Sequence, residues 1–230
     1  KEEWDYMDNS GLGIGTLYMW AKQDNFGKFK ELTANDLRRH LEKSLNSSHY
    51  NIACVVYQMY KEEFVYSKKK VWYQFFNHKW NKIDEGIALK RKISKDLVDE
   101  YLKLNITFSN QAQTLDDDDS VKEILIKKSE KTLGVVSKLG GNTFKKNILQ
   151  ECEELFYVEK FEENLDTNLT LIGFNNGVYD LVNDVFRNGI PDDNISYSTG
   201  IDYEVYDDND IYITEVRSFI QQVLPIKDIR

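Results

Sequence analysis

The stretch "EFVYSKKKVWYQFFNHKWNKID", residues 63–84, changes the spacing of apolar residues along the chain from helical to strand-like. Before it, apolar side chains recur with the helical period, and within it they recur with the period of about two that β-strands show. The polar residues at 68–70 and 77–79 interrupt this pattern and mark turns. The stretch therefore predicts three antiparallel strands in a small, aromatic-rich unit.

Helical patterns lie on both sides of this unit. A linker helix is predicted within residues 26–46, starting from Thr33 and with Leu37, Leu41 and Leu45 on its apolar face. Residues 50–60 are apolar nearly all round, which predicts a core helix. Residues expected at the start of further helices are Ser94, Ser120, Asn142 or Thr143, and Asp210.

A second group of strands is predicted between residues 169 and 205. The apolar runs are "LTLIGF", "GVYDL", "DVFR" and "ISYSTGIDYEV". Asn176 and Gly177 predict a sheet corner where glycine permits a positive φ, so a side chain at Gly177 should be tolerated poorly. The predicted fold class is α+β, mainly helical with two small antiparallel strand units.

Composition and charge limit the classes of function. The chain has 230 residues and a net charge of −9, which argues against a surface covered in nucleic-acid-binding charge but leaves room for a local basic face. Cys54 and Cys152 lie in apolar helical patterns and are expected to be buried, reduced thiols. Without a signal peptide or a run of 18 apolar residues, the protein is expected to be intracellular and not membrane-spanning. The absence of an initial Met suggests a piece of a longer protein.

Enzymatic motifs are weak in this chain. The string "GLGIGT", residues 11–16, lacks the preceding strand and βαβ unit that a dinucleotide loop requires, so packing glycines are the simpler interpretation. No Walker A string is present. The carboxylates at 116–119 suit a solvated loop better than a preorganised Mg²⁺ or Ca²⁺ site. We therefore assign no catalytic residue, no metal site and no cofactor to this chain.

Basic residues beside aromatic ones suggest a path for nucleic acid. The candidates are Lys68, Lys69 and Lys70 at the predicted hairpin tip, followed by Lys90, Arg91 and Lys92 before a helix. The alternative is ordinary solubility charge, with the neighbouring aromatic residues in the core.

Residues 173–203 carry a resemblance to a known family. The string "GFNNGVYDLVNDVFRNGIPDDNISYSTGIDY" resembles the domain that precedes the superfamily-3 helicase in poxvirus and giant-virus primase-helicases. The residues that match the family pattern are Asn176, Gly177, Val178, Asp180, Leu181, Phe186, Arg187, Pro191, Asp193, Ile195 and Ser196. The hairpin residues Tyr66, Trp72, Tyr73 and Trp80 also take the expected places. Asn176, Gly177, Asp180 and Arg187 are expected to be structural.

The resemblance implies a role in a larger replication protein, found in the host cytoplasm or a viral factory. The parent would be a hexameric helicase that uses ATP with Mg²⁺, and this chain a non-catalytic collar that supports assembly and guides DNA. The expected parts are a primase-associated tail (1–25), a linker helix (26–46), the collar (47–209) and the first helix of the helicase region (210–230). The alternative is a docking module that recruits other replication proteins without touching DNA.

Overall fold

The computed structural model describes residues 20–21, 24–117, 119–207 and 209–224, and the string at 11–16 lies outside them. The described chain is mainly helical with two small sheets, which confirms the predicted α+β class. The helices are α2 (Phe26–Lys43), α3 (His49–Tyr60), α4 (Ile87–Ser94), α5 (Asp96–Gln113), α6 (Ser120–Leu139), α7 (Asn142–Leu155), α8 (Phe161–Asn164) and α9 (Ile211–Val223). The strands are β1 (Phe64–Ser67), β2 (Trp72–Phe76), β3 (Lys79–Ile83), β4 (Tyr157–Val158), β5 (Leu171–Phe174), β6 (Gly177–Asp180) and β7 (Val185–Arg187). Short 3₁₀ turns are η2 (Ser44–Asn46), η3 (Asp84–Gly86) and η4 (Pro191–Asp193).

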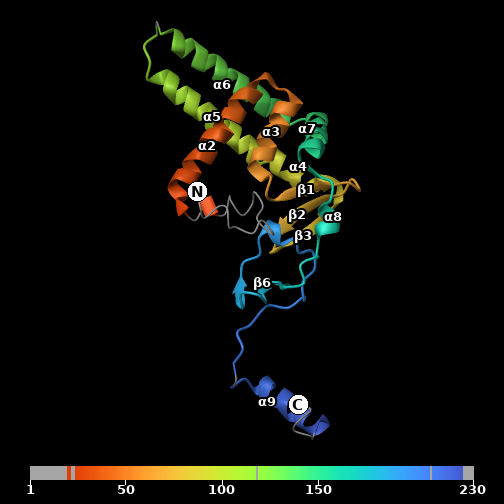
Figure 1. The fold of residues 1–230 in the computed structure, drawn as a ribbon. Coiled ribbons are helices and arrows are strands. Elements are labelled where there is room, and N and C mark those ends of the chain that lie inside the picture. Colours follow the sequence, from red (N-terminus) through yellow and green to blue (C-terminus); the bar gives the residue numbers. More distant parts are fainter. Residues whose placement is uncertain (1–19, 22–23, 118, 208, 225–230) are drawn as a thin grey trace, which may run out of the picture.

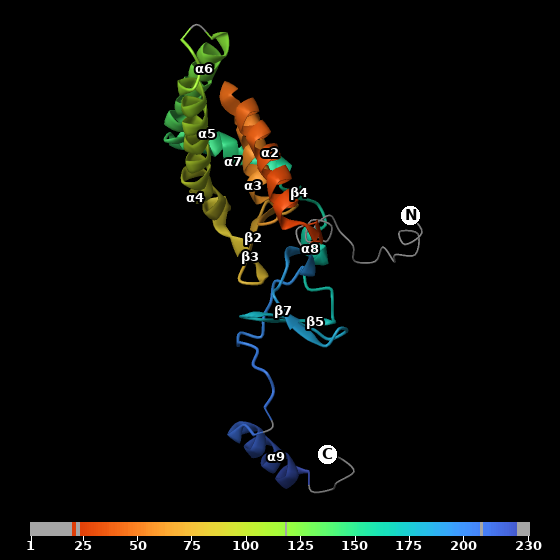
Figure 2. The ribbon, with the colours of Figure 1, turned by 90° about the vertical axis from the view of Figure 1, so that its left-hand side faces the viewer.

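The elements follow one another along an elongated molecule. Figure 1 shows the bundle of α2, α3, α5, α6 and α7 at one end and the sheet of β1–β3 beside it. The smaller sheet of β5–β7 lies beyond, and α9 stands at the opposite end, which Figure 2 shows from a second direction.

Helix α3 lies in the main hydrophobic core, as its nearly all-round apolar pattern predicts. Its side chains Ile52, Ala53, Val55 and Val56 are fully buried, and the helix packs against α2 and α7. Ser48 caps the helix start by accepting a hydrogen bond from the Asn51 backbone N–H. Burying a large apolar side chain contributes about 1.5–3 kcal/mol, so each of Ile52, Val55 and Val56 stabilises the helical part substantially.

The first sheet has the strand order β3-β2-β1-β4. The three predicted strands pair antiparallel, and Asn77 and His78 form the β2–β3 turn with φ values of 50° and 65°. Two positive φ values in succession match the hairpin turn whose twist suits the flanking strands. Strand β4, which the sequence pattern did not indicate, joins β1 in parallel after the chain has passed through four helices. The first sheet is therefore mixed.

The second sheet is an antiparallel meander of order β5-β6-β7. Phe174 pairs with Gly177, so Asn175 and Asn176 form the turn between β5 and β6. The expectation of a positive φ at the Asn176–Gly177 corner is wrong, because neither residue is among the described residues with positive φ. A Cβ on Gly177 would instead lie 2.5 Å from Phe186 Cζ and 2.6 Å from the Arg187 carbonyl oxygen. Close approach of β7, and not backbone strain, accounts for the glycine.

The last predicted strand, at 195–205, does not form. This segment divides its backbone hydrogen bonds between the two sheets: Trp80 N–H donates to Ile195, while Thr199 N–H donates to Gly173. The Asn175 N–H donates in turn to Ile201. Because no single neighbouring strand supplies a continuous ladder, the segment becomes an irregular strap that joins the sheets.

Several predicted helix starts shift by a few residues. Helix α2 begins at Phe26 after the capping residue Asn25, well before Thr33. Ser94 ends α4 and does not cap α5, because its hydroxyl donates to the Lys90 carbonyl within α4. Asp119 replaces Ser120 as the cap of α6, since its carboxylate accepts from the Val121 N–H at 2.8 Å. Local sequence patterns thus predicted where the helices lie more accurately than they predicted the first residue of each helix.

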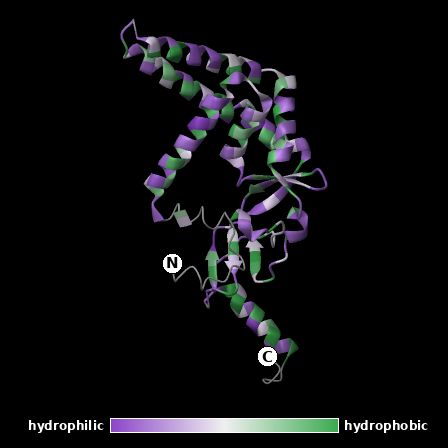
Figure 3. Cartoon of the chain, turned by 45° about the horizontal axis from the view of Figure 1, so that its top comes forward, coloured by the Kyte–Doolittle hydropathy of each residue, from purple (hydrophilic) through white to green (hydrophobic). Residues whose placement is uncertain are grey.

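Helix α9 begins at the predicted cap, Asp210, whose carboxylate accepts the Tyr212 N–H at 2.8 Å. None of its side chains is buried, and Tyr212 and Phe219 are 71% and 64% exposed. Figure 3 shows hydrophobic residues along this isolated helix. Among the described residues, no helix combines the length and apolar character needed to cross a bilayer.

Candidate functional site

The hairpin tip between β1 and β2 displays Lys68, Lys69 and Lys70, all exposed, as the sequence predicted. Two of them are engaged within the chain: Lys68 Nζ lies 3.4 Å from Glu159 Oε1, and Lys69 Nζ lies 2.7 Å from Glu162 Oε2. The Lys68–Glu159 pair is exposed on both sides, and such ion pairs are weak and exchange readily with other ions, whereas Glu162 is only 17% exposed. The positive charge of the hairpin tip is therefore partly neutralised by the carboxylates of Glu159 and Glu162, in the segment that includes α8.

Glu162 is the most highly coordinated of these carboxylates. Besides Lys69, it accepts hydrogen bonds from the Tyr73 hydroxyl at 2.9 Å and the Ser67 hydroxyl at 3.1 Å. The hydrogen bond from Lys69 is the main cause that holds the pKa of Glu162 below its ordinary value, so the group is ionised at neutral pH. Burial and its hydrogen bond to Glu162 raise the pKa of Tyr73 to about 12.

The second predicted basic group precedes helix α5, as the sequence suggested, but lies inside a separate short helix, α4, that the sequence did not indicate. Its member Lys92 faces inward, with Nζ 3.1 Å from Glu63 Oε2 and 4.7 Å from the centre of the Tyr60 ring. Asp96 Oδ2 lies 3.9 Å from the same nitrogen. Lys92 therefore holds α4 against the end of α3 and is a poor candidate for a DNA contact.

Lys90 and Arg91 remain available as DNA contacts, and a lysine of α7 contacts the end of the same helix. No ion pair is recorded for either side chain within the described part of the chain. Lys145, on α7, donates a hydrogen bond of 3.0 Å to Ser94 Oγ at the end of α4. We name Lys90, Arg91 and Lys145 the α4–α7 basic junction. Its third member was missed because sequence distance hid the contact between the two helices.

The residues of the Asn-Gly motif make structural contacts. Asn176 both donates to and accepts from the backbone of Tyr203, at 3.0 and 2.8 Å. Asp180 accepts from the backbone N–H of Val182 and Asn183, which closes the next turn. These bonds attach the strap and the turns to the second sheet.

Arg187 forms a two-pronged ion pair with Asp193. The guanidinium lies 2.8 and 2.7 Å from the two carboxylate oxygens, and the Ile190 N–H donates to the same carboxylate at 2.9 Å. Asp193 is nearly buried and Arg187 is 32% exposed, so the carboxylate of the pair is shielded from water and the guanidinium only partly. It fixes the path of the chain between β7 and the strap.

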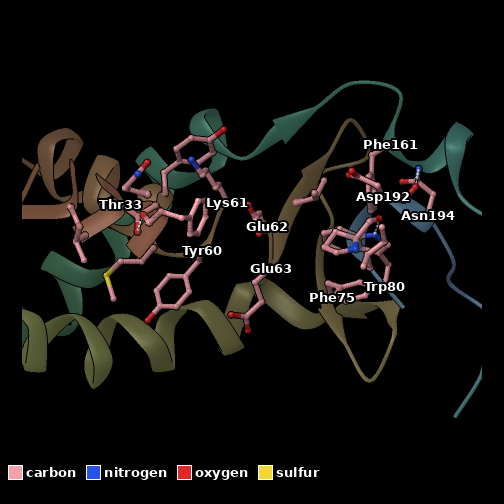
Figure 4. Close-up of a pocket in the computed structure, with 18 of the residues that line it drawn as sticks. Thr33, Tyr60, Lys61, Glu62, Glu63, Phe75, Trp80, Phe161, Asp192 and Asn194 are labelled. Carbon is pink, nitrogen blue, oxygen red and sulfur yellow. Dashed lines mark hydrogen bonds between the residues drawn. The ribbon is translucent and has the colours of Figure 1, made fainter. Parts of the chain in front are cut away.

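An open cleft lies between α2, the end of α3 and the first sheet. Its volume is about 1080 Å³. Figure 4 shows Trp80, Phe161 and Asp192 towards one end of the cleft and Thr33 and Lys61 towards the other. The described residues contain no group of three or more His, Cys, Asp or Glu side chains placed to hold a metal ion. The cleft thus offers an apolar surface with charged margins.

The acidic loop and the cysteines complete the predicted candidates. Asp117 pairs with Lys122, and Asp119 caps α6. Both cysteines are free thiols, with Cys152 fully buried and Cys54 only half-buried, which corrects the expected burial of Cys54.

Comparison with known proteins now bears on this arrangement. The family model described as "D5 N terminal like" matches residues 53–225, which include both sheets and most of the helical core. The chain belongs to the D5 N-terminal-like family. This confirms the resemblance inferred from residues 173–203.

Relatives of this D5 N-terminal-like chain come from large DNA viruses. A protein of Acanthamoeba polyphaga mimivirus named as a helicase is 33% identical over 97% of this chain. A protein of Invertebrate iridescent virus 3 named as a helicase is 26% identical over 95% of this chain. A protein of African swine fever virus named as a primase is 25% identical over 94% of it. The chain spans only 23%, 26% and 24% of those three proteins.

Proposed function

We propose that this chain is a non-catalytic collar domain of a viral replicative primase-helicase. The observation that carries the proposal is the family match over residues 53–225, together with relatives named as helicases and primases. In the parent protein, the domain would connect a primase to an ATP- and Mg²⁺-dependent motor, support assembly of a hexameric ring, and guide DNA.

The α4–α7 basic junction is the surface we assign to DNA. Its charges come from two helices held together by the bond between Lys145 and Ser94. Several other described lysines on the long helices have acidic partners: Lys103 pairs with Glu100 and Lys127 with Glu123. A local group of cations without such partners gives phosphates a contact despite the net charge of −9.

A double variant tests this assignment. Arg91→Gln with Lys145→Gln should lower the affinity for single-stranded DNA several-fold at low salt and reduce the salt slope by about 0.7 for each lost phosphate contact. The matched control, Lys103→Gln with Lys127→Gln, removes the same charge from side chains that are 70% and 64% exposed and already paired. Fluorescence anisotropy with a labelled oligonucleotide measures both. Equal effects of the two double variants would refute a localised DNA surface.

A docking function is the second candidate, and α9 favours it. This helix exposes an apolar stripe that includes Tyr212, Val216 and Phe219, and no residue of it is buried. The preceding segment is rich in Asp. If the 230-residue chain does not bind DNA even at low salt, recruitment of replication proteins replaces DNA guidance as the proposed role.

A further inference from the structure

Three hydrogen-bond donors converge on one point beside the hairpin tip. They are the hydroxyls of Ser67 and Tyr73 and the ammonium of Lys69, and all three reach Glu162 within 3.1 Å. The Glu162 side chain is 17% exposed, so the carboxylate is mostly surrounded by protein. This is the coordination expected of a bound anion, supplied here by the chain itself.

The donors and the acceptor come from elements of different rigidity. Ser67 and Tyr73 stand on the paired strands β1 and β2, and the Tyr73 ring packs 5.1 Å from that of Phe161. The acceptor belongs to α8, a helix of only four residues. The positions of the two hydroxyls are thus set by the sheet, whereas a change in one side-chain rotamer would withdraw the carboxylate.

We propose that Ser67, Lys69 and Tyr73 form a phosphate site for single-stranded DNA, which the Glu162 carboxylate occupies until a backbone phosphate displaces it. A phosphodiester resembles a carboxylate in carrying one negative charge on oxygens that only accept hydrogen bonds. The neighbouring Lys68 pairs with Glu159 in the same manner, at 64% and 63% exposure, and adds a second exchangeable cation. The inference rests on the proposed DNA-guiding role. It adds a second DNA contact, which the chain's own Glu162 fills in the absence of DNA.

Glu162→Gln tests the displacement directly. Glutamine keeps an oxygen that can accept from Ser67 and Tyr73 but removes the charge that competes with phosphate. Anisotropy titrations of the 230-residue chain with a labelled oligothymidylate should show a several-fold gain in affinity at low salt. The salt slope should steepen by about 0.7, the value for one additional phosphate contact on a single strand.

Glu163→Gln is the matched control. Glu163 is the next residue of α8, is exposed, and undergoes the same change of charge, but no ion pair is recorded for it in the described structure. Adding Lys69→Gln to Glu162→Gln should return the salt slope to that of the parent. Equal affinities and slopes for Glu162→Gln and Glu163→Gln would overturn the proposal, even if the parent binds DNA.

A measurement on the unmodified chain guards against a folding defect in the variant. Hydrogen exchange should become faster at Asn164, whose N–H donates to the Lys160 carbonyl in α8, when the oligonucleotide is added. Displacing Glu162 removes one attachment of α8 to the sheet and leaves the buried Phe161 to hold it. Unchanged exchange with DNA bound would overturn the inference while leaving DNA guidance through the α4–α7 basic junction intact. Absence of binding by both the parent and Glu162→Gln would overturn both.

Discussion

Replacing Gly177 by alanine should destabilise the second sheet through collision. The added Cβ would lie 2.5 Å from Phe186 Cζ and 2.6 Å from the Arg187 carbonyl oxygen, whereas ordinary van der Waals contacts begin at 3.4 Å. Shifts of about 0.9 Å for the Phe186 ring and about 0.8 Å for the Arg187 carbonyl are therefore needed, and the second must come from the backbone of β7. Overpacking of this kind costs about 1–3 kcal/mol, and Gly177→Val should cost more.

Gly134→Ala is a control that makes the same chemical change but should raise the free energy of unfolding instead of lowering it. Gly134 lies inside α6, and an added Cβ there would meet no atom within 4 Å. Alanine should therefore stabilise the helix by about 0.5–1 kcal/mol through its better propensity.

Urea denaturation followed by circular dichroism gives the free energy of unfolding of both variants. Hydrogen exchange at Val178, on β6, reports the second sheet separately if that sheet opens before the helical core. A Gly177→Ala protein with the stability and β6 protection of the parent would refute the argument from close approach. Loss of DNA binding without loss of stability would instead indicate that the Asn176–Gly177 corner contacts DNA directly.

Two further predictions concern charged and titratable groups. Asp193→Asn should lower the free energy of unfolding by about 1.5–3 kcal/mol, because it removes the carboxylate that accepts two hydrogen bonds from the Arg187 guanidinium. Asp202→Asn, at an exposed position, is the control, and equal denaturation midpoints would contradict the prediction. The raised pKa of Tyr73, about 12, means that the folded state favours the protonated phenol. Its contribution to stability is therefore complete below pH 10 and lost as the pH rises from 10 to 12. The difference in ultraviolet absorbance between the parent and Tyr73→Phe should titrate near pH 12, and a transition near pH 10 would show that the hydroxyl is not held by Glu162.

The α+β class, the three-stranded hairpin unit and the capping residue Asp210 follow from the sequence itself. Each depends on residues a few positions apart: strand and helix differ in the period of their apolar residues, and a cap acts on the next turn. The family was also evident from the residue pattern at 173–203. The domain boundaries and the role of the parent protein remain predictions.

Only the tertiary structure decided how the candidate residues are used. Lys68 and its partner Glu159 lie 91 residues apart, and Tyr66 pairs in parallel with Tyr157 of β4. Lys92 turned out to be an internal contact, while Lys145 joined the basic junction from another helix. A lysine has the same local pattern whether it faces solvent or a carboxylate, because the partner is brought to it by packing between distant segments. Local periodicity specifies the elements, but their packing determines which charges remain available to a ligand.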